Sequence, residues 1–119
     1  MRVFEFFSGI GGMRLALPSE VQVEKHVAYE VSPVVNQAYR HNFPDDRVVE
    51  KLVEHVKETD LDGQSDLWLL SPPCQPYTAT IHAKQKQSAD RRAQGFHYLI
   101  QVHLIHTNPP PDSIFIYFV

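Results

Sequence analysis

The sequence has little or none of several features that define protein classes. It contains one cysteine, Cys74, in 119 residues, so it can form neither an intramolecular disulfide framework nor an all-cysteine metal site. No apolar run approaches the roughly 20 residues that span a bilayer. Residues 1–7 carry an acid within an apolar stretch and lack a small-residue cleavage site, which is unlike a signal peptide. We therefore expect an intracellular protein, cytoplasmic or nuclear, with no membrane partner.

An excess of basic residues is also absent. Lys and Arg number 11 against 14 Asp and Glu, which gives a formal net charge of −3. This balance argues against a general polyanion binder, although residues 79–119 are mildly basic and favour a local anion-facing segment. Hydrophobic residues make up 43% and charged residues 21%, as in ordinary globular domains. The length allows a single domain, residues 1–119, with one modest core.

Apolar runs alternate with helical patterns along the chain. Strands are predicted at residues 3–7, 25–31, 47–51, 67–70 and 113–119. A short helix is predicted at residues 11–17, with Met13, Leu15 and Ala16 available for packing. Other helices are predicted from Pro33, with Ser32 as the N-cap, and over residues 90–105, while residues 79–90 resemble a mobile loop. Strands separated by helices indicate a doubly wound α/β fold with a parallel sheet.

The first candidate site is a glycine turn between the first strand and the first helix, Ser8-Gly9-Ile10-Gly11-Gly12. Glycines allow a sharp turn and close approach of a ligand, and a helix N-terminus offers free N–H groups. Glu30, at the end of the second strand, stands where a carboxylate commonly binds ribose hydroxyls. The alternative is an ordinary turn and a surface glutamate. The spacing G-x-G-G is not the dinucleotide fingerprint G-x-G-x-x-G, which makes a nicotinamide oxidoreductase the least favoured interpretation.

The second candidate is the segment Ser71-Pro72-Pro73-Cys74-Gln75-Pro76, directly after the fourth strand. A lone cysteine is usually a small core residue. Here three flanking prolines make a core position awkward and favour a nucleophile presented beyond the strand end. Neither His97, His103 and His106 nor the acidic residues between 50 and 62 form a ligand set with matching partners, so no metal site is predicted.

Together these motifs resemble the C5-cytosine methyltransferase family. The run FFSGIGGMRLAL is similar to the family's first motif, which binds S-adenosylmethionine (SAM), Glu30-Val31 is similar to the second, and SPPCQP resembles the catalytic loop. Thr78 after Tyr77 and the segment 36–44 resemble the tRNA-type subgroup. The resemblance implies a SAM-dependent methyltransferase (Rossmann-like) fold and a nucleic acid substrate, with tRNA favoured over DNA. The sequence leaves the oligomeric state open.

The resemblance also assigns roles to individual residues. It implies that Cys74 is the catalytic nucleophile, whose thiolate adds to C6 of a cytosine that has left its stack and so activates C5 for methylation. The implied cofactor-binding residues are Phe7, Ile10, Gly11 and Gly12 around the methionine and adenosine, Glu30 at the ribose, and Val31, Val53 and Glu54 at the adenine.

The sequence departs from the family pattern at its end. Tyr117 and Phe118 stand where the family has the Glu-Asn pair of its fifth strand, and the target-recognition region and C-terminal motifs are absent. We therefore expect an incomplete doubly wound sheet, the N-terminal part of a SAM-binding domain, that is inactive by itself. The alternatives are a non-catalytic SAM-binding remnant and a truncated gene product.

Overall fold

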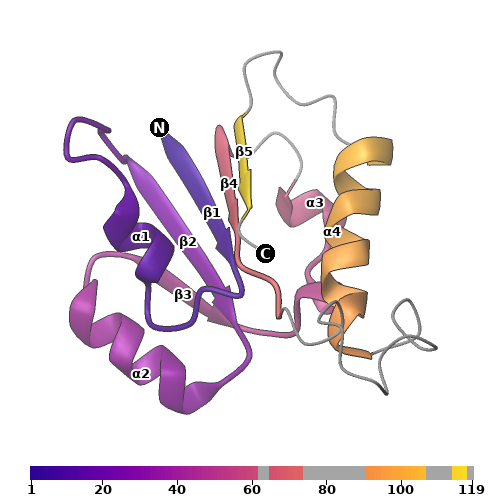
Figure 1. The fold of residues 1–119 in the computed structure, drawn as a ribbon, viewed down its shortest axis with the longest axis horizontal. Helices are drawn as coiled ribbons and strands as arrows, with labels where there is room; N and C mark the ends of the chain where they lie inside the picture. Colours follow the sequence, from indigo (N-terminus) through magenta and orange to yellow (C-terminus); the bar gives the residue numbers. More distant parts are fainter. Residues whose placement is uncertain (62–64, 74–90, 107–113, 118–119) are drawn as a thin grey trace, which may run out of the picture.

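The computed structural model describes residues 1–61, 65–73, 91–106 and 114–117 (Figure 1). Five strands form one sheet: β1 (Arg2–Phe6), β2 (Lys25–Glu30), β3 (Arg47–Glu50), β4 (Leu67–Leu70) and β5 (Ile114–Tyr117). Their spatial order is β3-β2-β1-β4-β5, and every neighbouring pair is parallel. The chain order reverses between β1 and β4, as in Rossmann-like sheets. The predicted parallel α/β sheet is confirmed.

Helices cover both faces of the sheet, which makes it doubly wound (Figure 1). On one face lie α1 (Gly12–Ala16) and α2 (Pro33–Asn42). On the other lie the 3-10 helix η1 (Val53–His55), α3 (Glu58–Leu61) and α4 (Arg91–His106). No helix in the described part of the chain is both long and apolar enough to cross a membrane.

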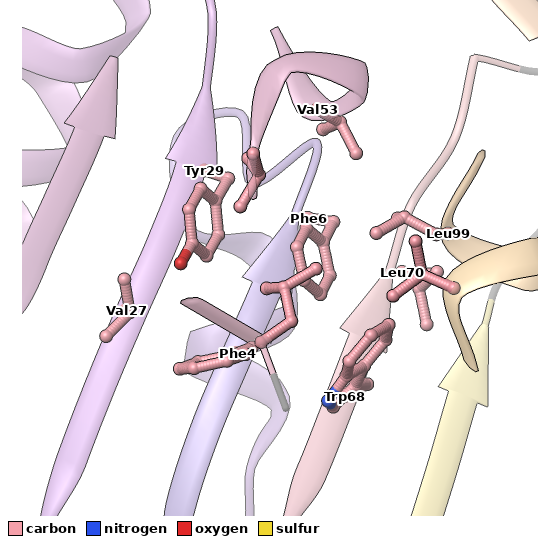
Figure 2. Packing of buried hydrophobic residues seen from close by; sticks show 11 residues of the cluster. Phe4, Phe6, Val27, Tyr29, Val53, Trp68, Leu70 and Leu99 are labelled. Carbon is pink, nitrogen blue, oxygen red and sulfur yellow. The ribbon is translucent and has the colours of Figure 1, made fainter. Parts of the chain in front are cut away.

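The main core lies between the sheet and the layer of η1, α3 and α4, and Figure 2 shows its side chains. Side chains alternate across a strand, so Phe4 and Phe6 of β1 point into this core. The Phe6 ring stacks on Tyr29 with 5.0 Å between centroids and lies 5.0 Å from Trp68. The buried members of the cluster are Phe4, Phe6, Val27, Tyr29, Val53, Val56, Leu61, Trp68, Leu70, Leu99 and Val102. Burying each large side chain contributes about 1.5–3 kcal/mol.

A smaller cluster lies on the opposite face, where Val3, Leu67 and Leu69 pack against residues of α1 and its flanking loop. Met13 packs there as predicted. The predictions for Leu15 and Ala16 are wrong, because both are exposed and Leu15 keeps 78% of its surface. A helix of five residues makes little more than one turn, so only part of it can face the sheet.

The start of α2 is confirmed as predicted. Pro33 is the first helical residue, and the Ser32 hydroxyl accepts a hydrogen bond from the Val35 N–H at 3.5 Å. A turn at residues 43–46 follows α2, in which the Asp46 N–H donates to the Phe43 carbonyl at 3.2 Å. The sequence analysis missed η1 and α3, which are too short to produce a hydrophobic period. The mobile loop predicted at 79–90 lies outside the described residues.

Candidate functional site

Four connecting segments meet at one edge of the sheet, where parallel strands β1 to β4 end. The register pairs Phe6 with Tyr29 and with Leu70, and Glu30 with Glu50. The segments that follow these strand ends are residues 7–12, 31–32, 51–54 and 71–73. Ligands of open α/β sheets bind beyond the carboxyl ends of the strands, so this edge is where a site is expected.

The turn after β1 has a costly backbone conformation. Gly9 has φ 54° and Gly11 has φ 93°, values that glycine adopts without strain. Phe7 also has a positive φ, 58°, which is rare for a residue with a bulky side chain. Such strained residues occur at functional sites and need support from their surroundings. The Ser8 N–H donates to the Tyr29 carbonyl at 3.2 Å, which ties this turn to β2.

The Glu30 carboxylate connects the turn to the next strand end. Its Oε2 accepts from the Gly9 N–H at 3.2 Å, and its Oε1 accepts from the N–H groups of Val31 at 2.8 Å and Ser32 at 3.0 Å. A carboxylate accepts about four hydrogen bonds. Glu30 thus organises the site and keeps capacity for a ligand hydroxyl.

A cavity of about 350 Å³ opens between these segments and α4. This volume falls within the range of small-molecule sites. Its walls combine apolar residues with the charged residues Glu30, Lys51 and Glu54. The lining residues are Phe7, Tyr29, Glu30, Val31, Lys51, Leu52, Val53, Glu54, Ser71, Pro73 and Gly95. The arrangement suits a ligand with a planar apolar part and hydroxyl groups.

A second cavity, of about 370 Å³, lies along β2 and β3 and has Lys25, Arg47 and Lys51 among its lining residues. It contains none of the residues that the sequence motifs singled out, and Phe4, Lys25, Val27 and Arg47 place it along the middle and amino ends of the strands. We therefore assign the candidate site to the cavity at the carboxyl ends.

Burial determines the charge of the tyrosine shared by both cavities. Burial is the largest influence on the pKa of Tyr29 and raises it. The nearby charge of Arg47 lowers this pKa and that of Asp60 raises it, so the pKa is higher than usual. The Tyr29 hydroxyl is therefore neutral at physiological pH.

Within the described residues, no group of three or more His, Cys, Asp or Glu side chains could hold a metal ion.

The structure brings together five of the predicted site residues. Phe7, Glu30, Val31, Val53 and Glu54 all line the cavity.

The other predicted residues do not line it. Ile10 is 61% exposed, and Gly11 is buried against α2. Gly12 is exposed at the start of α1. Cys74 lies outside the described residues, and it directly follows Pro73, which does line the cavity.

Gly95 of α4 is a site residue that the sequence analysis missed. A Cβ at this position would lie 3.0 Å from Glu54 Oε2 and 3.2 Å from Phe7 Cζ. The missing side chain therefore lets α4 approach both residues closely. A glycine inside a helix costs about 0.5–1 kcal/mol relative to alanine, and such an unfavourable residue is itself a signal of close packing.

The sequence matches the family model described as C-5 cytosine-specific DNA methylase over residues 1–111. The chain is 41% identical over 105 residues to a tRNA (cytosine(38)-C(5))-methyltransferase of Rattus norvegicus, covering 86% of this chain and 26% of that protein. It is 36% identical over 118 residues to a DNA (cytosine-5)-methyltransferase of Dictyostelium discoideum, covering 98% of this chain and 30% of that protein. The chain thus spans between a quarter and a third of these relatives.

Solved structures give the same result. The Entamoeba histolytica methyltransferase EhMeth superposes with a TM-score of 0.78 at 28% identity, covering 93% of this chain and 35% of the other. The S. pombe Dnmt2 methyltransferase superposes with a TM-score of 0.72 at 30% identity, covering 93% of this chain and 32% of the other.

Proposed function

The chain belongs to the C-5 cytosine-specific DNA methylase family, and we propose that residues 1–119 form the N-terminal part of a catalytic, SAM-binding domain. The observation that carries this proposal is the convergence of Phe7, Glu30, Val31, Val53 and Glu54 around one cavity at the strand ends. These residues come from three separate segments of the chain. A nucleotide-like ligand explains why a carboxylate and apolar side chains meet there.

The residues of the cavity fit SAM. Glu30 already accepts three backbone hydrogen bonds and keeps capacity for one ribose hydroxyl. Val31, Leu52 and Pro73 offer apolar surface for the adenine. The Phe7 ring favours the positive charge of a sulfonium, and by family resemblance Val53 and Glu54 would contact the adenine. Ile10, Gly11 and Gly12 belong to the adjoining turn and, by family resemblance, would contact the methionine and adenosine.

The proposed chemistry is methyl transfer to cytosine C5. SAM, when bound, supplies an electrophilic methyl group. The Cys74 thiolate would form a bond to C6 of the base, so that C5 becomes nucleophilic and takes the methyl group. Loss of the C5 proton then breaks the sulfur–carbon bond and restores the thiolate. We propose tRNA as the substrate, supported by the name of the rat relative, with DNA as the alternative that the Dictyostelium relative suggests.

SAM binding is tested by calorimetry on the 119-residue chain. We expect Glu30→Ala to weaken binding by about 10- to 100-fold, because a hydrogen bond to a charged group contributes about 1.5–3 kcal/mol. Cys74→Ala is the matched control, since the thiol acts on the base, and we expect it to leave SAM affinity unchanged. Wild-type chain that is folded but binds no SAM would refute the proposal.

Methyl transfer is tested separately with tritiated SAM. Because the chain spans between a quarter and a third of the relatives described above, we propose that by itself it binds SAM without transferring the methyl group to tRNA or DNA. Incorporation of label that disappears in Cys74→Ala would contradict this part and would make the chain an active enzyme.

A further inference from the structure

An acidic side chain is buried in the middle of the sheet, behind the glycine turn. Glu5 of the central strand β1 has no exposed surface. Its Oε2 accepts a hydrogen bond from the Tyr39 hydroxyl at 2.9 Å and lies 3.0 Å from His26 Nε2. Within the described residues, Glu5 Oε1 and His26 Nδ1 have no hydrogen-bond partner. A buried polar group with incomplete partners is costly, so this position calls for a reason beyond packing.

Tyr39 connects this carboxylate to a second one. Its hydroxyl also lies 3.3 Å from Asp46 Oδ2, and the Arg14 Nε donates to the same oxygen at 2.8 Å. Burial and the two carboxylates raise the pKa of Tyr39, so the hydroxyl keeps its proton and remains a donor. The resulting network runs from β1 through the end of α2 to α1.

The end of α2 also contacts the glycine turn directly. A Cβ on Gly11 would lie 2.3 Å from Phe43 Cε2 and 3.1 Å from Tyr39 Cε2, so the Gly11 backbone lies against both rings. The Asn42 side-chain amide donates to the Ile10 carbonyl at 3.4 Å. The Arg14 guanidinium lies 5.5 Å from the centre of the Phe43 ring. These contacts reach the turn from the α2 face of the sheet, opposite the face on which the cavity is lined by Phe7 and Tyr29.

The turn needs such support because its conformation is strained. Phe7, which opens the turn, has a positive φ that is costly for a bulky side chain, and strained backbone persists only where its surroundings over-determine it. Glu30 holds the turn from the β2 side through the Gly9 N–H. Tyr39, Asn42 and Phe43, which we call the α2 end, hold it from the opposite face.

We propose that the α2 end positions the glycine turn for the methyl donor, and that Tyr39, fixed by Glu5 and Asp46, is its central positioning residue. The inference rests on the proposed function for the identity of the ligand. Its structural part, the control of the turn by Tyr39, stands without any ligand. Tyr39 contacts the backbone of the turn and lines no part of the cavity, so its effect on binding is indirect.

Tyr39→Phe tests the proposal because it keeps the ring and removes only the hydroxyl. We expect amide hydrogen exchange at Gly9 and Gly11 to become about tenfold faster and the Kd for SAM to rise about tenfold. Ser65→Ala is the matched control. It removes an equally buried hydrogen bond, which Trp68 Nε1 donates to the Ser65 hydroxyl at 2.5 Å. This bond lies at the amino end of β4, whereas the glycine turn lies at the carboxyl ends of the strands. Ser65→Ala should lower the free energy of unfolding by a similar amount and change neither readout.

The outcomes separate the two proposals. If the wild-type chain binds no SAM, the proposed function fails. The role of Tyr39 is then still tested by amide exchange at Gly9 and Gly11 in Tyr39→Phe, because this measurement needs no ligand. Unchanged exchange at Gly9 and Gly11 in Tyr39→Phe, or an equal change in Ser65→Ala, would overturn the inference. If Tyr39→Phe does not fold, Asn42→Ala gives the same test from an exposed position. Faster exchange at Gly11 is then expected, and unchanged exchange would refute the role of the α2 end.

Discussion

At the scale of single residues, the two adjacent glycines that open α1 have different physical roles. Gly11 has φ 93°, and a Cβ there would overlap the Phe43 ring. Gly12 has no atom within 4 Å of the place a Cβ would occupy. The sequence motif treats both glycines as parts of one SAM-binding turn. The structure distinguishes a glycine that is required by the packing from one that is not.

This difference predicts opposite effects of two alanine substitutions on the free energy of unfolding. Gly11→Ala should lower the free energy of unfolding by about 2–5 kcal/mol. The left-handed backbone conformation costs alanine about 1–2 kcal/mol, and overpacking against Phe43 costs about 1–3 kcal/mol. Gly12→Ala should leave the free energy of unfolding unchanged or raise it by about 0.5 kcal/mol, because alanine favours the helix. Urea unfolding of both variants measures the difference. Equal losses would show that the contact with Phe43 does not restrict the turn.

At the scale of elements, the strands and long helices could be predicted because their signals are local. The run Leu67–Leu70 is apolar and bounded by turn residues, and the structure places β4 there without shift. Ser32-Pro33 marks the start of α2 for the same reason. Elements of three or four residues such as η1 and α3 give no period. They depend on tertiary packing that no local pattern contains, since Val53 of η1 and Leu61 of α3 are buried in the main cluster.

The candidate site could be predicted only as far as its motifs extend. The glycine turn and Glu30 follow from their spacing, and Val53 and Glu54 follow from the family resemblance alone. The contacts of Tyr39 with Glu5 and Gly11 span 34 and 28 positions in the chain, and the approach of Gly95 to Phe7 spans 88. Such long-range contacts depend on how the layers stack. Glu5 interrupts an apolar run in the sequence, and nothing local indicates that it is fully buried.

An ion pair joins the amino ends of β1 and β4. Asp66 accepts from the Arg2 backbone N–H at 2.7 Å, and its Oδ1 lies 2.8 Å from Arg2 Nη2. Hydrogen bonds from the Arg2 side chain and backbone, in that order, lower the pKa of Asp66. A carboxyl whose pKa is lower in the folded state stabilises the fold above its unfolded pKa, near 3.9, and loses that contribution as the pH falls through its folded pKa.

The resulting prediction concerns acid unfolding. Between pH 7 and about 4.5 the wild-type chain should be more stable than Asp66→Asn by a constant, small amount, because both partners are partly exposed. The difference should shrink below about pH 4, as Asp66 is protonated. Chemical unfolding over a pH series checks this, and Glu20→Gln, which changes an exposed acid, serves as control. A difference that grows toward low pH would contradict the assignment.

At the scale of the whole molecule, the two faces of the sheet are unequal. Among the described residues, the cluster on the face under η1, α3 and α4 holds eleven buried apolar side chains, whereas the cluster on the opposite face holds three, beside the polar network around Glu5. The apolar face therefore supplies most of the free energy of folding, while the polar face positions the glycine turn. The strained turn and the candidate cavity lie where the two faces meet, at the carboxyl ends of β1 and β2.

This distribution predicts that the described elements unfold as one unit. Trp68, the sole tryptophan, is 5% exposed and lies within 6.5 Å of the Phe4 and Phe6 rings, centroid to centroid. Its fluorescence therefore reports on the cluster that joins β1, β2 and β4 to the helices above them. We expect fluorescence and far-UV circular dichroism to show one coincident transition, with a calorimetric enthalpy of about 80 kcal/mol near 60 °C for a chain of this length. Two separated transitions would mean that the polar face unfolds before the apolar core. Absence of a cooperative transition would mean that this sequence needs further contacts to fold, and the SAM site would then form only together with them.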